Sequence, residues 1–292
     1  MSPGRTAAPG PETRVDAAAR MSLNAEGVGT MGGSNRHRLL VEERRRKILE
    51  SLDQSERVTV QELVRRFGVS AVTVRKDLDA LTDAGAIVRS HGGALKPIGP
   101  TDIAINIKEI LHHEEKVRIG AAAAALVQND ETIILDSGTT TLEVARQLAA
   151  RKFRALTVIT NGLNIAMELA HLSHVRLLMI GGLVRHVSYS VVGPHAEQML
   201  QGLNADRLFL GVDGLDLQIG LMTPDVLEAQ LNTQLIRVAR EVNVVTDSTK
   251  FGRRSLSLIA RLNAVHRVIT DDKIEPAVAE ALRAQGIAVL TA

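Results

Sequence analysis

The sequence contains no cysteine, which excludes disulfide bonds, thiolate zinc sites and a cysteine nucleophile, and which suits a reducing cytoplasm. It has no tryptophan and one tyrosine, and aromatic residues make up only 2% of the chain, so aliphatic side chains must fill the core. No apolar run approaches the roughly 20 residues that cross a bilayer, and the N-terminus lacks the compact apolar block of a secretory signal. These absences predict a cytoplasmic globular protein.

The 292 residues are enough for two domains, and a hydrophobic content of 45% is ordinary for proteins with a buried core. Residues 1–35 are rich in Pro, Gly, Ala and Ser without periodicity, and we expect a disordered tail in which Met21 or Met31 could be the true start. Residues 36–96 carry 13 Lys and Arg against 9 Asp and Glu, whereas residues 97–292 carry 19 against 21. The basic segment either faces a polyanion or is a solvated basic face, and charge alone does not decide.

Residues 36–95 show helical periodicity in three short stretches. The first helix is predicted over Leu40–Leu52, and the second begins at Thr59, which forms a T-x-x-E capping box with Glu62. Ser70 caps a third helix that Gly85 ends. A short strand at residues 86–89 and a Gly-rich turn at residues 91–94 follow, and the whole segment predicts a winged helix-turn-helix.

The third helix is expected to enter the major groove, where its exposed side chains meet base edges. With Val74 and Leu78 buried, Ser70, Val72, Thr73, Arg75 and Lys76 remain at its N-terminal end. Basic and polar side chains on the first helix and the wing are better placed for phosphates, and these are Arg44, Arg45, Arg89 and His91. The alternative is a protein-interaction module with solvated basic residues.

Residues 96–115 are interpreted as a linker with a short helix, and residues 116–292 alternate between apolar strands and helices. Continuous apolar strands joined by helical crossovers predict an α/β domain with a mostly parallel sheet covered on both faces. The expected strands are Thr132–Leu135, Leu156–Thr160, Val175–Ile180, Arg207–Val212, Val242–Thr246, Arg267–Thr270 and Ile287–Leu290. The expected helices include Leu142–Ala150, Leu163–Ala170 and Val226–Arg240.

The first of these strands runs into a strand-to-helix turn of hydroxyl side chains, made of Asp136, Ser137, Gly138, Thr139, Thr140 and Thr141. Backbone N–H groups and hydroxyls at a helix N-terminus bind anions, although a plain helix cap has the same composition. The turn lacks the Gly-Lys-Ser/Thr of a nucleotide-binding P-loop.

Other strands also end in polar or glycine residues, namely Asn161, Gly162, Gly181, Asp213 and Lys250. Ligands of parallel sheets bind beyond the carboxyl ends of the strands, so these positions predict one crevice. Lys250 could pair with a phosphate there, or be an ordinary surface lysine.

The stretches Arg45–Leu49, Val69–Leu78 and Arg89–Ala94 resemble the DeoR family of bacterial transcription regulators, and the resemblance extends from about Arg44 to the C-terminus. One departure is Lys76, where the family usually has arginine. A lysine contacts phosphate well but lacks the guanidinium fork that recognises guanine bidentately.

The resemblance implies an effector domain similar to sugar-phosphate isomerases. Ser137 to Thr141 would hold a phosphate, and Asn161, Asp213 and Lys250 would line the sugar site. The segment Ala205–Asp216, with Leu227–Ala229 after it, looks closest to the branch that represses N-acetylgalactosamine catabolism. The implied function is repression of a sugar or amino-sugar operon, relieved by a phosphorylated sugar.

Two other classes of function are alternatives to this one. Asp213, Asp216 and Glu228 could serve as general acids and bases in a sugar-phosphate isomerase with a DNA-binding appendage. The residues after Lys250, however, are Phe251, Gly252 and two arginines rather than the glycine-rich loop of such isomerases. A purely structural DNA-binding protein would not need polar turns at so many strand ends. We therefore expect a homo-oligomeric regulator, not an enzyme, that binds double-stranded operator DNA and needs no cofactor or metal.

Overall fold

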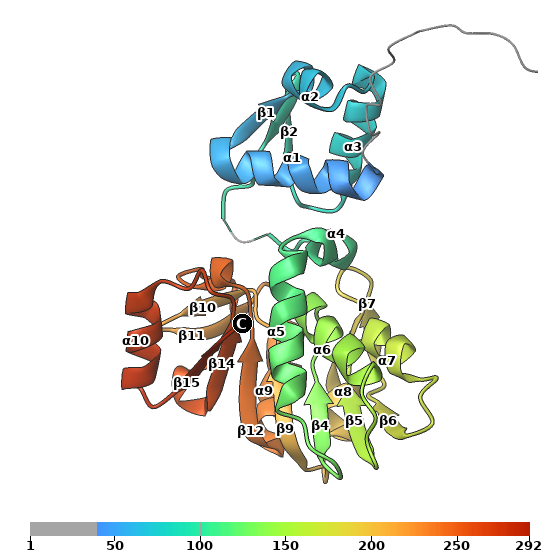
Figure 1. The fold of residues 1–292 in the computed structure, drawn as a ribbon, viewed down its shortest axis with the longest axis vertical. Helices are drawn as coiled ribbons and strands as arrows, with labels where there is room; N and C mark the ends of the chain where they lie inside the picture. The colour runs from blue at the N-terminus through green and yellow to red at the C-terminus, as the bar shows by residue number, and fades with distance from the viewer. Residues whose placement is uncertain (1–39, 100) are drawn as a thin grey trace, which may run out of the picture. The chain divides into compact units, whose positions relative to one another are not determined.

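The computed structural model describes residues 40–99 and 101–292, and the predicted tail at residues 1–35 lies outside this part of the chain. An N-terminal domain of three helices and three short strands comes first, and a larger α/β domain follows (Figure 1).

The helices of the N-terminal domain begin and end at the predicted capping residues. The Thr59 hydroxyl accepts a hydrogen bond from the Glu62 N–H, and the Glu62 carboxylate accepts one from the Thr59 N–H, so the predicted capping box is confirmed. Gly68 ends the second helix with a φ of 65°, which glycine adopts without strain. The Ser70 hydroxyl accepts from the Thr73 N–H. The three helices are α1 (Val41–Ser55), α2 (Val60–Phe67) and α3 (Ala71–Asp83).

The wing is a three-stranded antiparallel sheet in the order β1-β3-β2, one strand more than the predicted hairpin. Ala86 and Ile87 are buried in the core before the second strand begins, so this strand starts later than its apolar residues suggest. The three strands of the wing are β1 (Arg57–Thr59), β2 (Val88–Ser90) and β3 (Gly93–Leu95).

The core of this domain consists of the side chains that the helical periodicity places inward. Ile48, Leu63 and Leu78 are at most 2% exposed. A further helix, α4 (Ile105–Ile110), contributes Ile107 to the same hydrophobic cluster. The cluster therefore includes a residue of the predicted linker.

The larger domain is built on a seven-stranded sheet in which every pair of neighbouring strands is parallel, with the order β15-β14-β12-β9-β4-β5-β6. Each of the seven predicted strands is one strand of this sheet, so the predicted α/β class is confirmed. The strands are β4 (Thr132–Leu135), β5 (Leu156–Thr160), β6 (Val175–Met179), β9 (Ala205–Leu210), β12 (Ala239–Val245), β14 (Arg267–Thr270) and β15 (Ala288–Thr291).

Both faces of the sheet are buried. Ile133 and Leu135 belong to one hydrophobic cluster and Ile134 between them to the other, as the alternation of a strand requires. The first cluster packs against α5 (His113–Ala125), α6 (Thr139–Ala149) and α7 (Leu163–Leu169). The second packs against α8 (Pro194–Met199), α9 (Val226–Val238) and α10 (Pro276–Ala284).

The short elements around the sheet were not predicted. Each has only three or four residues, which are too few to show a periodic pattern. They are β7 (Leu183–Arg185), β8 (Ser190–Val192), β10 (Gly214–Asp216), β11 (Gly220–Thr223), β13 (Ser257–Ala260) and the 3₁₀ turns η1 (Ser248–Lys250) and η2 (Leu262–Ala264). β7 pairs with β8, and the other three strands form a sheet in the order β10-β11-β13.

The predicted linker is packed against the α/β domain. The Asp102 carboxylate forms an ion pair with Arg185 at 2.6 Å, and the Ile105 N–H donates to the Val187 carbonyl at 2.7 Å. The helix α5 begins at His113, three residues before the predicted boundary at residue 116. Among the helices of residues 40–99 and 101–292, none has the length and apolar character to span a membrane.

Candidate DNA interface and ligand site

The N-terminal end of α3 presents the side chains that were predicted to read bases. Val72, Arg75 and Lys76 are exposed, while Val74 and Leu78 are fully buried beneath them. The hydroxyls of Ser70 and Thr73 lie 2.9 Å apart and cap the helix, so they are partly committed to its first turn. An exposed aliphatic and two cations on one helix end suit a major groove.

The structure corrects the prediction for Arg44. Its guanidinium is buried, and its Nε lies 2.5 Å from the Asp77 carboxylate on α3. Arg45 reaches the other oxygen of Asp77 at 3.3 Å but remains partly exposed. Arg44 thus joins α1 to α3 inside the domain and is not available to a phosphate.

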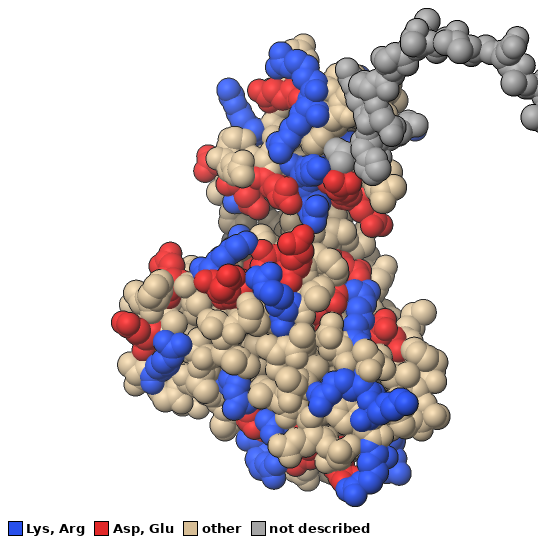
Figure 2. Space-filling model, viewed as in Figure 1, with Lys and Arg blue, Asp and Glu red and all other residues tan. Residues whose placement is uncertain are grey.

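On the wing, Arg89 and His91 are exposed, as phosphate contacts must be. Arg89 donates to the Gly93 carbonyl and pairs with Asp79, which holds it beside the turn. On the face seen in Figure 2, Lys and Arg side chains gather over the α2 region of the N-terminal domain. They also gather at the edge of the α/β domain where the sheet strands begin, so positive charge alone does not mark the DNA interface.

A cavity of about 520 Å³ lies at the carboxyl ends of β4, β9 and β12. This is the end of a parallel sheet at which ligands bind. The predicted residues that line it are Asp136, Ser137, Gly138, Thr139, Thr140, Asp213 and Lys250. Residues Leu49, Leu52, Asp53 and Ala86 of the N-terminal domain also line it.

The hydroxyl-rich turn forms the N-terminus of α6. Gly138 is the N-cap residue and supplies no side chain, so the first N–H groups of the helix are left for another acceptor. Thr139 and Thr140 follow and line the cavity, each 8% exposed. Thr141 instead turns its hydroxyl to the Gly138 carbonyl and is fully buried. The turn therefore offers two hydroxyls and the positive end of a helix dipole to a ligand.

Besides Thr141, three of the predicted ligand residues do not line the cavity. Asn161 accepts from the Ser137 N–H at 3.1 Å, so it braces the turn from behind. Gly162 packs against the Ser137 Cα and has its N–H bonded to the Thr160 hydroxyl. Gly181 lies beside Met199, away from the cavity lining. These residues correct the prediction that every polar strand end contributes a ligand contact.

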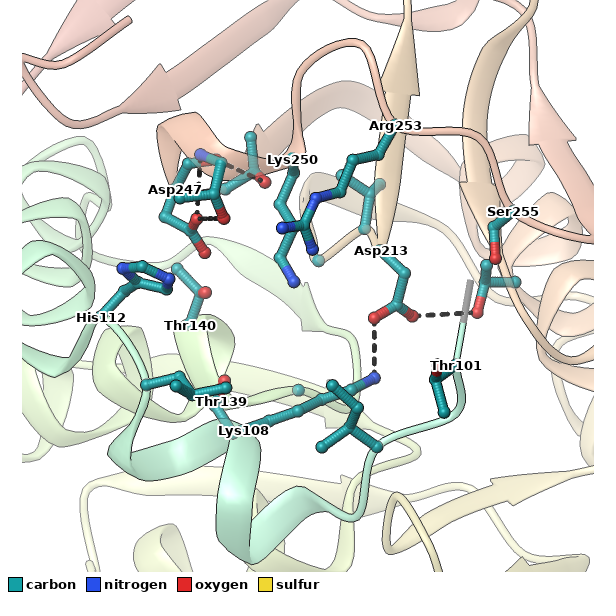
Figure 3. Close-up of a pocket in the computed structure, with 18 of the residues that line it drawn as sticks. Thr101, Lys108, His112, Thr139, Thr140, Asp213, Asp247, Lys250, Arg253 and Ser255 are labelled. Carbon is teal, nitrogen blue, oxygen red and sulfur yellow. Dashed lines mark hydrogen bonds and ion pairs between the residues drawn. The ribbon is translucent and has the colours of Figure 1, made fainter. Parts of the chain in front are cut away.

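Asp213 is a charged acceptor inside the cavity. The Lys108 ammonium of α4 lies 2.7 Å from one carboxylate oxygen, and the Thr223 hydroxyl lies 3.3 Å from the other. Burial raises the pKa of Asp213, but the ammonium groups of Lys108 and Lys250 outweigh it and hold the pKa below its usual value. Figure 3 shows the Lys250 ammonium directed into the cavity between Thr140 and Asp213.

Asp136 differs from Asp213 because no cation among residues 40–99 and 101–292 is paired with it. Its carboxylate accepts from the Gly211 N–H at 3.2 Å and is 2% exposed. Burial, and then the charge of Glu228, raise the pKa of Asp136 well above its usual value.

The cavity is also lined by charged or titratable residues that were not predicted as ligand contacts, namely Lys108, His112, Lys116, Asp247, Arg253, Arg254, Glu228, Lys96 and Asp53. The first three belong to or border the predicted linker, where nothing in the local pattern points to the sheet. Asp247 follows the strand β12, so the rule used for Asp213 could have found it.

The carboxylates proposed for an enzyme are occupied by structural partners. Asp216 accepts from Arg254 at 2.7 Å and from two backbone N–H groups of its own turn. Glu228 accepts from Arg185, Ser188 and Ser190, each at 2.6 Å. A carboxylate with this many donors is a poor proton acceptor for a substrate.

Two families match the chain. Residues 44–97 match the DeoR-like helix-turn-helix domain, and residues 111–272 match the DeoR C-terminal sensor domain.

Several regulators are similar over most of their length. The putative aga operon transcriptional repressor of Escherichia coli is 41% identical over 251 residues, which cover 85% of this chain and 93% of that protein. The regulator GolR of Listeria innocua is 34% identical, covering 85% of this chain and 97% of that protein. The regulator GlpR of Haloferax volcanii is 34% identical, covering 86% and 98%.

Solved structures are similar at a greater distance. Ribose 5-phosphate isomerase A of Methanocaldococcus jannaschii has a TM-score of 0.35 and 18% identity, covering 48% of this chain and 55% of that chain. The Pyrococcus horikoshii translation initiation factor eIF-2B has a TM-score of 0.41 and 16% identity, covering 78% and 87%.

Proposed function

Since the chain belongs to the DeoR family of DNA-binding transcription regulators, we propose that α3 and the wing bind operator DNA and that the sheet-end cavity binds a phosphorylated sugar. The relatives are named as regulators, and the chain is a regulator rather than an enzyme. The similar aga operon repressor supports a sugar or amino-sugar catabolic operon as the target. As a transcription regulator it works in the cytoplasm, and it binds operator DNA as a homo-oligomer.

The observation that carries the ligand proposal is the uncapped N-terminus of α6 inside the cavity. The dipole and free N–H groups of a helix start favour a phosphate, and Thr139 and Thr140 add two hydroxyl donors. Lys250 supplies a cation from the opposite side of the cavity. Asp213, which accepts hydrogen bonds, suits the hydroxyl or amino groups of the sugar.

The proposal is tested by removing the two threonine hydroxyls together, Thr139→Ala with Thr140→Ala. Each hydrogen bond to a charged group contributes roughly 1.5–3 kcal/mol, so affinity for the effector should fall by about two decades or more. Operator affinity without effector should stay unchanged, because neither residue lies in the N-terminal domain. Calorimetry with hexose, hexosamine and N-acetylhexosamine 6-phosphates identifies the best binder, and operator titrations with and without it give the response.

The matched control is Thr291→Ala, which removes an exposed threonine hydroxyl at the end of β15. It should leave both affinities as in the wild type. If the double variant releases DNA at the wild-type effector concentration, the phosphate site lies elsewhere. If it loses operator binding without effector, the two threonines serve the fold or the oligomer instead.

A further inference from the structure

Lys116 is a buried lysine whose hydrogen bonds go to another helix. It lies on α5 and is 4% exposed, and its ammonium donates to the carbonyls of Lys108 and Leu111. The bond to Leu111 is 2.6 Å long. These carbonyls belong to the last turn of α4, where a helix leaves its carbonyl groups without internal partners. Lys116 therefore caps the C-terminus of α4.

Lys116 is also one of the residues that line the cavity, together with Thr139, Thr140 and Lys250. Gly120, one turn further along α5, allows α5 to pack closely against α6, because a Cβ there would lie 2.8 Å from the Glu143 backbone of α6. Both acceptors of Lys116 are neutral carbonyls, which bind an ammonium more weakly than an anionic oxygen does. A phosphate at the N-terminus of α6 would therefore compete for Lys116.

The charges around Lys116 come from two segments of the chain. Asp247 and Lys250 follow β12, Lys108 and Glu109 lie on α4, and burial is the largest influence. Burial lowers the pKa of Lys116 to about 7, with Asp247 opposing this and the two lysines adding to it. In the part of the chain that the structure describes, the hydrogen bonds of this ammonium go to carbonyls and not to a carboxylate.

The helix α4 is also joined to the DNA-binding domain. Ile107 is 2% exposed within its hydrophobic cluster. The Ala104 N–H, at the start of α4, donates to the carbonyl of Ala84, the C-cap residue of α3, at 3.0 Å. A change at the C-terminus of α4 thus reaches the end of the recognition helix through direct contacts.

We propose that Lys116 changes partner when the effector binds: it holds the α4 carbonyls in the free protein and the phosphate oxygens in the complex, which releases α4. This inference rests on the proposed function, and it adds the step that connects the cavity to DNA affinity. The Lys108–Asp213 ion pair is a second contact between α4 and the cavity. Sugar groups that bind Asp213 weaken this ion pair, and this also releases α4.

The test measures hydrogen exchange of the α4 amides in the full chain. In Lys116→Met without any ligand, these amides should exchange about tenfold faster than in the wild type, and operator affinity should already be reduced. Lys152→Met is the matched control: it removes an exposed lysine that does not line the cavity, so α4 should exchange as in the wild type. Protection of the α5 and α6 amides reports that each variant is folded.

In the wild type, galactosamine 6-phosphate should speed α4 exchange, whereas unphosphorylated galactosamine at the same concentration should not. Calorimetry in buffers of different ionisation enthalpy should show that the wild type takes up more protons on binding than Lys116→Met does, because the phosphate raises the pKa of Lys116. Unchanged α4 exchange in Lys116→Met would overturn the proposal. If no sugar phosphate binds the wild type, the proposed effector class fails, while the ligand-free comparison still decides whether Lys116 holds α4.

Discussion

At the scale of single residues, Asp77 shows how one buried charge organises the DNA-binding domain. Its carboxylate is 2% exposed and accepts from Arg44 on one oxygen and from Arg45 on the other. The pair joins α1 to the recognition helix α3, so the angle between the helices depends on it. A charge in this position needs its partners, because an unpaired buried charge is far more costly than a paired one.

We therefore expect Asp77→Asn to destabilise the N-terminal domain by roughly 1.5–3 kcal/mol, since it removes the negative charge that accepts hydrogen bonds from the guanidinium groups of Arg44 and Arg45. Thermal unfolding followed by circular dichroism should show the transition of this domain about 10 °C or more lower. Asp79→Asn is the control, because its side chain is exposed and its ion pair with Arg89 contributes little. Equal shifts for the two variants would contradict the structural role of Asp77.

At the scale of elements, the ends of α3 and α6 determine what each helix can bind. The helix α3 is capped by its own Ser70, and its exposed side chains rather than its N–H groups are left to contact DNA. The helix α6 has glycine at its N-cap and leaves its N–H groups open. The same element type thus presents side chains at one site and backbone donors at the other.

For α3 we expect Arg75→Ala to relax sequence preference, with a loss of about 1–3 kcal/mol at one base pair, since an exposed arginine at this position faces base edges. Arg89→Ala on the wing should weaken binding to all sequences alike. It should also reduce the slope of log affinity against log salt concentration by about one, as loss of a phosphate contact does. Fluorescence titrations of operator and scrambled duplexes across a salt series separate the two effects. The reverse pattern would mean that the wing reads bases and α3 does not.

At the scale of the whole molecule, each chain supplies a single recognition helix and a single wing. One such unit covers too little DNA for tight specificity, and regulators of this kind reach it by binding two half-sites with a symmetric assembly. Exposed apolar side chains, such as Leu183 and Val184, lie on β7.

We predict a homo-oligomer at micromolar concentration that binds repeated or palindromic half-sites. Sedimentation velocity gives the oligomeric state, and operator fragments with one or two half-sites give the affinities. The two-site fragment should bind at least ten times more tightly, because the second contact is intramolecular. A monomer that binds one half-site with full affinity would refute the prediction.

The sequence by itself determined the architecture. All seven strands of the parallel sheet are visible as apolar runs, because a strand buried on both faces needs an apolar residue at nearly every position. The caps at Thr59, Gly68 and Ser70 are equally local, since each side chain or backbone conformation serves its own helix end. The turn at the start of α6 was also predicted, because its residues are neighbours in the sequence and form one strand-to-helix junction.

Only the tertiary structure decided which of these residues meet. Lys108 comes from the segment interpreted as a linker and Lys116 from its border, and they reach the cavity because α4 and α5 pack against the sheet. Arg44 is indistinguishable from its basic neighbours until Asp77, 33 residues away, is placed beside it. Asn161 supports the turn instead of lining the site, because β5 pairs directly with β4. Periodicity records how deeply a residue is buried, whereas its partner across the chain depends on packing that no local pattern encodes.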